Sequence, residues 1–129
     1  MSGRFLLDTN ILIALFAETK SVLEHLVEAE EVFVAAIVLG ELQYGAHKSE
    51  RIAENIAKID QFAQNAAVLA CDAGTARHYG VIKNHLRAKG RPIPENDIWI
   101  AAVAMQHRVT IVSRDPHFRE ISDLDLQVW

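Results

Sequence analysis

The sequence lacks features that define several classes of small protein. It contains one cysteine, Cys71, so it can form no internal disulfide, and no second cysteine completes a zinc-binding pattern. No uninterrupted apolar run is long enough to cross a membrane. We therefore expect a protein of the reducing cytoplasm that has no membrane partner, with Cys71 as a small residue of the core.

Positive charge is also scarce. The 13 lysines and arginines are outnumbered by 17 aspartates and glutamates, which gives a formal net charge of -4. A general basic surface that holds nucleic acid is excluded, so any contact with nucleic acid must be local or assisted by a metal ion. The chain has 129 residues, half of them hydrophobic, which suits one domain over 1–129 with little room for a second.

Short apolar runs alternate with segments of helical periodicity along the chain. Residue types and capping signals predict strands near 5–7, 32–35, 66–70, 109–112 and 126–129, and helices near 11–17, 22–27, 37–47, 51–64, 72–90 and 98–105. Such alternation is typical of a parallel sheet covered on both faces. We predict a three-layer α/β/α sandwich with a mainly parallel sheet of about five strands.

Four acids fall near the expected carboxyl ends of strands or the starts of helices. Asp8 and Asp115 follow two strands, and ligands collect at that edge of an α/β sheet. Glu41 has apolar neighbours in an early part of its helix, and Asp97 opens a helix that is apolar nearly all round. Simpler roles remain open: a turn or cap for Asp8, a solvent-facing side chain for Glu41, and a helix cap at Asn96 or Asp97.

Convergence of the four acids would require a cation, because grouped carboxylates repel one another unless a divalent ion neutralises them. Ligand sets made only of oxygen select Mg²⁺ or Mn²⁺. The reaction that most needs such a cluster is phosphodiester hydrolysis, where the ion activates water and stabilises developing charge. A metal-dependent nuclease is therefore the chemical hypothesis.

Other polar residues carry weaker signals. A basic cluster near the end of the helix at 72–90 could contact phosphates, or could complement the helix dipole, which is the commoner role: Lys83, Arg87, Lys89 and Arg91. Five histidines are assigned to surface or packing roles, because none has partners at ligand spacing: His47, His78, His85, His107 and His117. At the first helix, Thr9 or Asn10 is the expected cap.

Ordered motifs over nearly the whole chain resemble those of PIN domains of the VapC toxin type. The motifs are Leu6-Leu7-Asp8-Thr9-Asn10-Ile11-Leu12-Ile13, Glu41-Leu42-Gln43-Tyr44-Gly45-Ala46, the segment from Gly90 to Ala102, and Ser113-Arg114-Asp115-Pro116-His117-Phe118. The resemblance implies a metal site of Asp8, Glu41 and Asp97, with Asp115 as a fourth acid at the least uniform position. Thr9, Asn10 and Ser113 would be supporting polar groups.

The same resemblance implies a biological setting. It implies an endoribonuclease that cleaves selected RNA, acts as the toxin of a toxin-antitoxin pair, often forms a homodimer, and is inhibited by a VapB-like antitoxin that covers the site. Spacing and composition alone do not distinguish RNA from DNA as the substrate.

Three alternatives were weighed against the sequence. A phosphate-accepting receiver domain would need an acceptor Asp after the third strand, where Ala67-Val68-Leu69-Ala70 stands, and a late lysine, although none follows Lys89. A haloacid-dehalogenase-like phosphatase would usually have a second Asp at Asn10. The third alternative is a PIN fold that binds nucleic acid or protein without turnover, and the complete set of acids argues against it.

Overall fold

The computed structural model describes residues 3–129. Its strands are β1 (Arg4–Leu7), β2 (Glu31–Ala35), β3 (Ala67–Leu69), β4 (Thr110–Val112) and β5 (Leu126–Gln127). They form one sheet in the order β3-β2-β1-β4-β5, and every pairing is parallel. Phe5 of β1 is in register with Val32 of β2 and with Thr110 of β4. The predicted five-stranded parallel sheet is confirmed.

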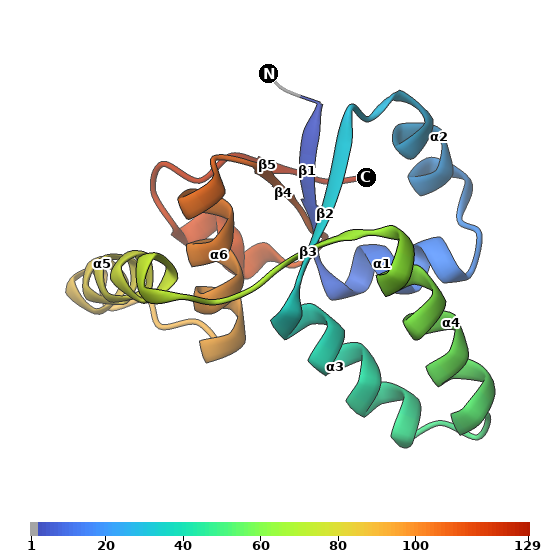
Figure 1. The fold of residues 1–129 in the computed structure, drawn as a ribbon. Helices are drawn as coiled ribbons and strands as arrows, with labels where there is room; N and C mark the ends of the chain where they lie inside the picture. Colours follow the sequence, from blue (N-terminus) through green and yellow to red (C-terminus); the bar gives the residue numbers. More distant parts are fainter. Residues whose placement is uncertain (1–2) are drawn as a thin grey trace.

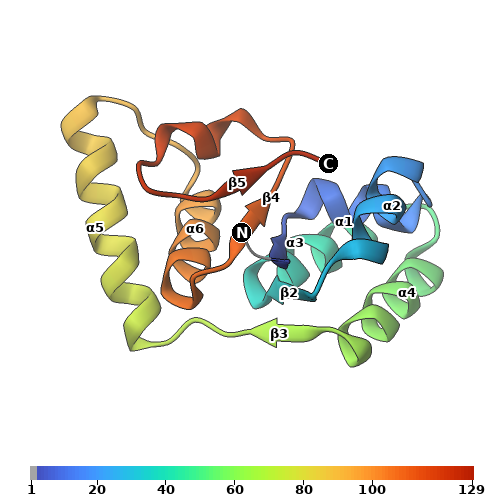
Figure 2. The same ribbon diagram turned by 90° about the horizontal axis from the view of Figure 1, so that it is seen from above.

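Helices cover both faces of this sheet. They are α1 (Thr9–Phe16), α2 (Lys20–Glu28), α3 (Ala36–His47), α4 (Ile52–Asn65), α5 (Ala73–Lys89) and α6 (Glu95–His107), with a short 3-10 helix, η1 (Pro116–Glu120). Figures 1 and 2 show α5 and α6 on one side of the sheet and α1, α2 and α4 on the other. The three-layer α/β/α architecture predicted from the alternation is therefore confirmed.

The core lies between these layers. Leu6 and Leu7 of β1 are fully buried, and so is the stretch Ile100–Ala104 of α6. Burial of large aliphatic side chains of this kind contributes roughly 1.5–3 kcal/mol each. No helix in residues 3–129 is long and apolar enough to span a bilayer.

The order of the strands creates a crevice beside β1. The chain passes from β1 outward to β2 and β3, and then returns to the other side of β1 as β4 and β5. In open α/β sheets the crevice at such a switch point, beyond the carboxyl ends of the strands, is where ligands bind. Asp8 follows β1 and Ser113 follows β4 at this point, and the backbone N–H of Asp8 donates to the carbonyl of Val112 at 3.0 Å.

Three local predictions were wrong. Helix α1 begins at Thr9, with Asp8 at its N-cap position, so neither Thr9 nor Asn10 is the cap. Helix α6 begins at Glu95 after Pro94, which places Asp97 in its first turn instead of at a cap. Cys71 is exposed in the connection between β3 and α5, outside the core.

Both ends of helix α5 lie where the capping signals in the sequence predicted them. Asp72 accepts a hydrogen bond from the backbone of Thr75, whose hydroxyl accepts from the backbone of Asp72, and this reciprocal pair forms a capping box. Gly90 ends the helix with a φ of 67°, a left-handed conformation that glycine adopts without steric cost. This turn sends the chain into the loop that precedes α6.

Candidate active site

Four acids from four elements meet at the carboxyl edge of the sheet. Asp8 follows β1, Asp115 follows β4, Glu41 lies on α3, and Asp97 lies in the first turn of α6. Asp8 is 4% exposed and Asp97 is 8% exposed, whereas Glu41 and Asp115 are half-buried. The charges of Glu41 and Asp115 raise the pKa of Asp8, and those of Asp115 and Asp8 raise the pKa of Asp97. The structure thus brings together all four acids that the sequence singled out.

A single buried hydroxyl connects the two strand ends. The Oγ of Ser113 donates to Oδ2 of Asp8 at 2.7 Å and accepts from the backbone N–H of Asp115 at 2.9 Å. The Asn10 side chain completes the arrangement, because its Nδ2 donates to Ser113 Oγ at 3.3 Å and its Oδ1 accepts from the backbone N–H of Arg114 at 3.1 Å. Ser113 and Asn10 therefore fix the loop after β4 against Asp8.

Replacing Ser113 by Ala is expected to lower the free energy of unfolding by about 1–3 kcal/mol, because it leaves buried polar groups without their partner. Urea unfolding in EDTA measures the change. The control is Ser122→Ala, which alters an exposed serine and should stay within about 0.5 kcal/mol of the wild type. Equal stability of the two variants would show that the hydroxyl has no structural importance.

Glu41 is held from both sides. The Thr9 hydroxyl donates to its Oε1 at 2.6 Å, and Nδ2 of Asn96 donates to its Oε2 at 3.3 Å. Thr9 comes from α1 and Asn96 from α6, so the two hydrogen bonds join three helices at the site. Asn96 was not predicted as a site residue, although its position beside Asp97 in the motif Pro94-Glu95-Asn96-Asp97 was a signal that could have indicated it.

His117 is exposed, as assigned, but it also belongs to this cluster, so the expectation that it has no partners at ligand spacing was wrong. Its Nδ1 lies 3.1 Å from Oδ2 of Asp97 and 2.9 Å from Oδ1 of Asp115. One potential ligand atom from each of these three residues lies within 4.8 Å of the others. The cause is local: Asp115 caps η1 by accepting the backbone N–H of His117 at 3.0 Å, which turns the imidazole toward both acids. Of the other four histidines given the same assignment, His47 and His85 are exposed, and His78 and His107 are half-buried.

Burial and mutual repulsion raise the pKa values of the two most enclosed acids. Burial is the main cause of the raised pKa of Asp8, opposed by the hydrogen bond from Ser113 and increased by the charges of Glu41 and Asp115. Burial followed by the charge of Asp115 raises the pKa of Asp97 to about 6, against the opposing hydrogen bond to His117. Partial desolvation lowers the pKa of His117, but its contacts with Asp97 and Asp115 outweigh this effect and raise it overall.

This donor set fits a divalent cation. No lysine or arginine in residues 3–129 forms an ion pair with any of the four acids, so the enclosed carboxylates have no permanent positive partner there. Carboxylate oxygens are the ligands that hard divalent ions prefer, and the His117 imidazole adds a nitrogen that transition metals accept. The acids of the cluster could therefore hold a metal ion.

The basic residues at the end of α5 behave in two ways. Lys83 pairs with Glu95 at 3.0 Å, and Lys89 pairs with Glu120 at 3.7 Å while also donating to the Glu120 carbonyl at 2.6 Å. Arg87 and Arg91 are exposed and form no ion pair with a residue of 3–129. The charges of the two lysines are thus already partly offset, whereas those of the two arginines are available to a ligand.

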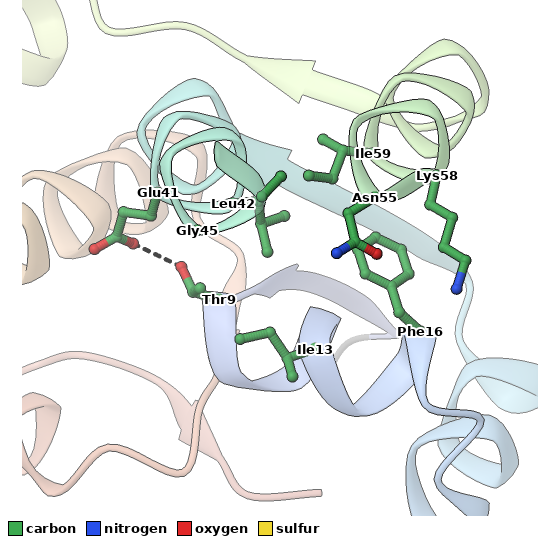
Figure 3. A pocket seen from close by; sticks show the side chains of 10 residues that line it. Thr9, Ile13, Phe16, Glu41, Leu42, Gly45, Asn55, Lys58 and Ile59 are labelled. Carbon is green, nitrogen blue, oxygen red and sulfur yellow. Dashed lines mark hydrogen bonds between the residues drawn. The ribbon is translucent and has the colours of Figure 1, made fainter. Parts of the chain in front are cut away.

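An apolar groove runs from Glu41 along α1, α3 and α4 (Figure 3). Its cavity has a volume of about 310 Å³. The hydrogen bond between Thr9 and Glu41 marks the end nearest the acids, and Asn55 and Lys58 of α4 lie at the other end. Its apolar walls are formed by Ile13, Phe16, Leu42 and Ile59, and Ile13 is 57% exposed. This apolar surface lies directly beside the acid cluster, because Glu41 belongs to both.

Comparison with known proteins places the chain in a family. The model of the PIN domain matches residues 5–124. The chain is 33% identical to ribonuclease VapC2 of Rickettsia felis, with 97% of each chain covered, and 33% identical to the tRNA(fMet)-specific endonuclease VapC of Shigella flexneri, with 98% of each covered. The crystal structure of DNA-bound VapBC from Salmonella typhimurium superposes with a TM-score of 0.90 at 29% identity, covering 100% of this chain and 99% of the other. The chain therefore belongs to the PIN-domain family and, within it, to the VapC-type ribonucleases of toxin-antitoxin systems.

Proposed function

We propose that this protein is a Mg²⁺- or Mn²⁺-dependent endoribonuclease whose metal ligands are Asp8, Glu41 and Asp97, with Asp115 as a fourth acid. The observation that carries the proposal is the convergence of these carboxylates without a lysine or arginine among the described residues to neutralise them. Membership of the VapC-type ribonucleases supplies the reaction class. The same family membership excludes the phosphate-accepting receiver domain that was considered from the sequence.

The residues around the acids have positioning roles in this proposal. Ser113 orients the Asp8 carboxylate, and Thr9 with Asn96 orients that of Glu41. His117 holds Asp97 and Asp115 together through one ring nitrogen. When bound, the ion would activate water and offset the negative charge that develops on the phosphate. Oriented ligands reduce the reorganisation that binding and catalysis would otherwise require.

The substrate class follows from the relatives. Ribonuclease VapC2 of Rickettsia felis carries the activity in its name, and the Shigella flexneri relative is named for initiator tRNA. We propose structured RNA as the substrate and initiator tRNA as the first RNA to test. A negatively charged protein with an acidic site cannot hold such an RNA by charge alone, so the metal ion and a few local contacts must do so.

Purified protein is expected to cleave RNA in Mg²⁺ or Mn²⁺ and to lose that activity in EDTA, because the acids alone repel the phosphate. Gel assays with initiator tRNA and a panel of structured RNAs measure this, and adding Mg²⁺ in excess of EDTA should restore cleavage. Absence of cleavage with both ions, in protein freed of any antitoxin, would leave the PIN fold that binds without turnover as the remaining alternative.

We also propose a VapB-like antitoxin as the protein partner. Structural relatives are VapBC complexes, including those of Rickettsia felis and Salmonella typhimurium. The exposed apolar groove beside Glu41 is a surface that such a partner would cover. Homodimer formation and a cytoplasmic location stay predictions from the sequence, and light scattering of the purified chain tests the former.

A further inference from the structure

A second hollow borders the acid cluster at His117. It lies between the loop from α5 to α6 and the start of η1, and its volume is about 420 Å³. Its walls include Arg91, Pro92, Ile93, Pro116 and His117. His117 belongs both to this hollow and to the acid cluster, where its Nδ1 contacts Asp97 and Asp115. The hollow therefore opens directly beside the proposed site of cleavage, and its volume is in the range of about 300–1,000 Å³ typical of ligand clefts.

The charge in this hollow suits an anion. Arg91 carries the one permanent positive charge among the lining residues, and it forms no ion pair within residues 3–129. Glu120 also lines the hollow, but Lys89 offsets its charge at 3.7 Å. A guanidinium is always charged and presents paired N–H donors that match a phosphate.

The backbone holds Arg91 in place before any ligand binds. Gly90 turns in the left-handed conformation, and the N–H of Arg91 donates to the carbonyl of Leu86 at 3.0 Å. Pro92 follows directly, and Ile93 is 9% exposed, so the next two residues are restricted as well. Less conformational entropy is therefore lost when a ligand binds here than at a mobile arginine.

We infer that this hollow is a subsite for the RNA strand, in which Arg91 binds a phosphodiester next to the one that is cleaved. The inference rests on the proposed function. The carboxylates repel each phosphate that comes near them unless a positive charge offsets the repulsion, and the metal would do so only for the phosphate that it contacts. Arg91 supplies that charge on the far side of His117, while Pro92 and Pro116 give apolar contact to the sugar or base.

The experiment compares RNA binding by three variants. Labelled initiator tRNA, the first substrate proposed above, is titrated with protein by fluorescence anisotropy in Ca²⁺, with gels to verify that the RNA stays intact. Arg91→Ala should weaken binding about 10-fold or more, and should lower the slope of log affinity against log salt by about 0.7–0.9. Arg91→Lys should fall between this variant and the wild type, because it keeps the charge and loses the paired donors.

The matched control is Arg87→Ala, which removes the same charge from the last turn of α5, outside the hollow. It should bind RNA within about twofold of the wild type. Equal weakening by Arg87→Ala and Arg91→Ala would indicate a diffuse electrostatic effect and overturn the subsite. The subsite would also be overturned if Arg91→Ala bound RNA as tightly as the wild type does. This holds even if the variant loses antitoxin binding.

Metal binding separates this inference from the proposed function. Arg91→Ala should gain the same thermal stability from Mg²⁺ as the wild type, because Arg91 forms no ion pair with any of the four acids within residues 3–129. A lost Mg²⁺ response would mean that the substitution distorts the acid cluster, and the subsite would fail. If RNA binding depends on Arg91 but the wild type cleaves no RNA in Mg²⁺ or Mn²⁺, the nuclease proposal fails while the subsite stands.

Discussion

Asp8→Asn is expected to reduce the rate of RNA cleavage by at least about 100-fold while the fold survives. The change removes one carboxylate charge from the proposed metal site, and a metal ion at such a site supplies several kcal/mol of transition-state stabilisation. A loss of about 2.7 kcal/mol corresponds to 100-fold in rate. Asn keeps the shape of the side chain and an oxygen that can accept the hydrogen bond from Ser113. Because burial raises the pKa of Asp8, a neutral side chain should be tolerated there.

Two measurements check this expectation. The first is the cleavage rate of purified protein, and the second is growth of the host after induction of the wild type or the variant at equal expression. Asp123→Asn is the matched control: it makes the same change of charge outside the acid cluster, at a residue with a φ of 63° that Asn adopts readily. If Asp8→Asn cleaved RNA and slowed growth as the wild type does, Asp8 would not be part of the site.

The four acids could be found from sequence because strand ends are positions that topology brings together. Parallel strands end at the same edge of a sheet, so identifying the two strands was enough to place Asp8 and Asp115 at one edge. The neighbouring residues were harder to place. From local patterns Thr9 and Asn10 looked like helix caps, and only the family resemblance marked them as supporting polar groups. Their side chains bind Glu41 and Ser113, which lie 32 and 103 residues further along the chain. Capping rules describe only local partners, so these contacts had no local signal.

His117 and Asn96 were missed for a related reason. The imidazole reaches the acids because Asp115 caps η1 and Pro116 starts it, and neither event follows from hydrophobic periodicity. Asn96 was considered only as a possible helix cap, because Pro92 and Pro94 suggested that the helix starts later than Glu95. Proline at an N-cap is compatible with a helix that begins at the next residue, since the first turn needs no N–H from it. The two prolines marked the start of the helix in the sequence, but they were interpreted as a longer non-helical segment than the structure has.

The basic cluster shows what a sequence cannot resolve about charge. Lys83, Arg87, Lys89 and Arg91 look equivalent along α5, but pairing with Glu95 and Glu120 depends on α6 and η1 folding back on that helix. Those partners are 12 and 31 residues away from Lys83 and Lys89, respectively. Only the folded chain distinguishes the two arginines from the two lysines.

Asp97→Asn is expected to stabilise the metal-free protein at neutral pH and to reduce the stabilisation by Mg²⁺. The pKa of Asp97 is raised from 3.8 to about 6, which corresponds to at most about 3 kcal/mol of destabilisation when the carboxylate is charged. Below pH 3.8 the side chain is protonated in the folded and the unfolded chain, so this penalty is absent. Between pH 4 and 6 the unfolded chain loses the proton first, so stability falls as the pH rises, and above 6 the penalty is complete.

Asn relieves that penalty but also weakens the contact with His117. The pKa of His117 is raised, so its contribution is present at low pH and is lost as the pH rises through its value in the folded protein. Comparing Asp97→Asn with its parent in a His117→Gln background removes this second titration. In that background and in EDTA, the stabilising effect of Asn should be present at pH 7.5 and absent near pH 4.

Mg²⁺ should reduce the stability advantage of Asp97→Asn over the wild type. An ion that binds only the folded wild type adds about 2.7 kcal/mol at 100 times its dissociation constant. Asp97→Asn has one charged ligand fewer, so it should bind Mg²⁺ more weakly and gain less at the same concentration. Thermal melts of both proteins at constant ionic strength, with EDTA and over a Mg²⁺ titration, measure this directly. Four unrelated acids would give melting temperatures that are independent of Mg²⁺, and Asp97→Asn would then melt at the wild-type temperature in EDTA. A shared site requires that the melting temperature of the wild type rise more with Mg²⁺ than that of the variant.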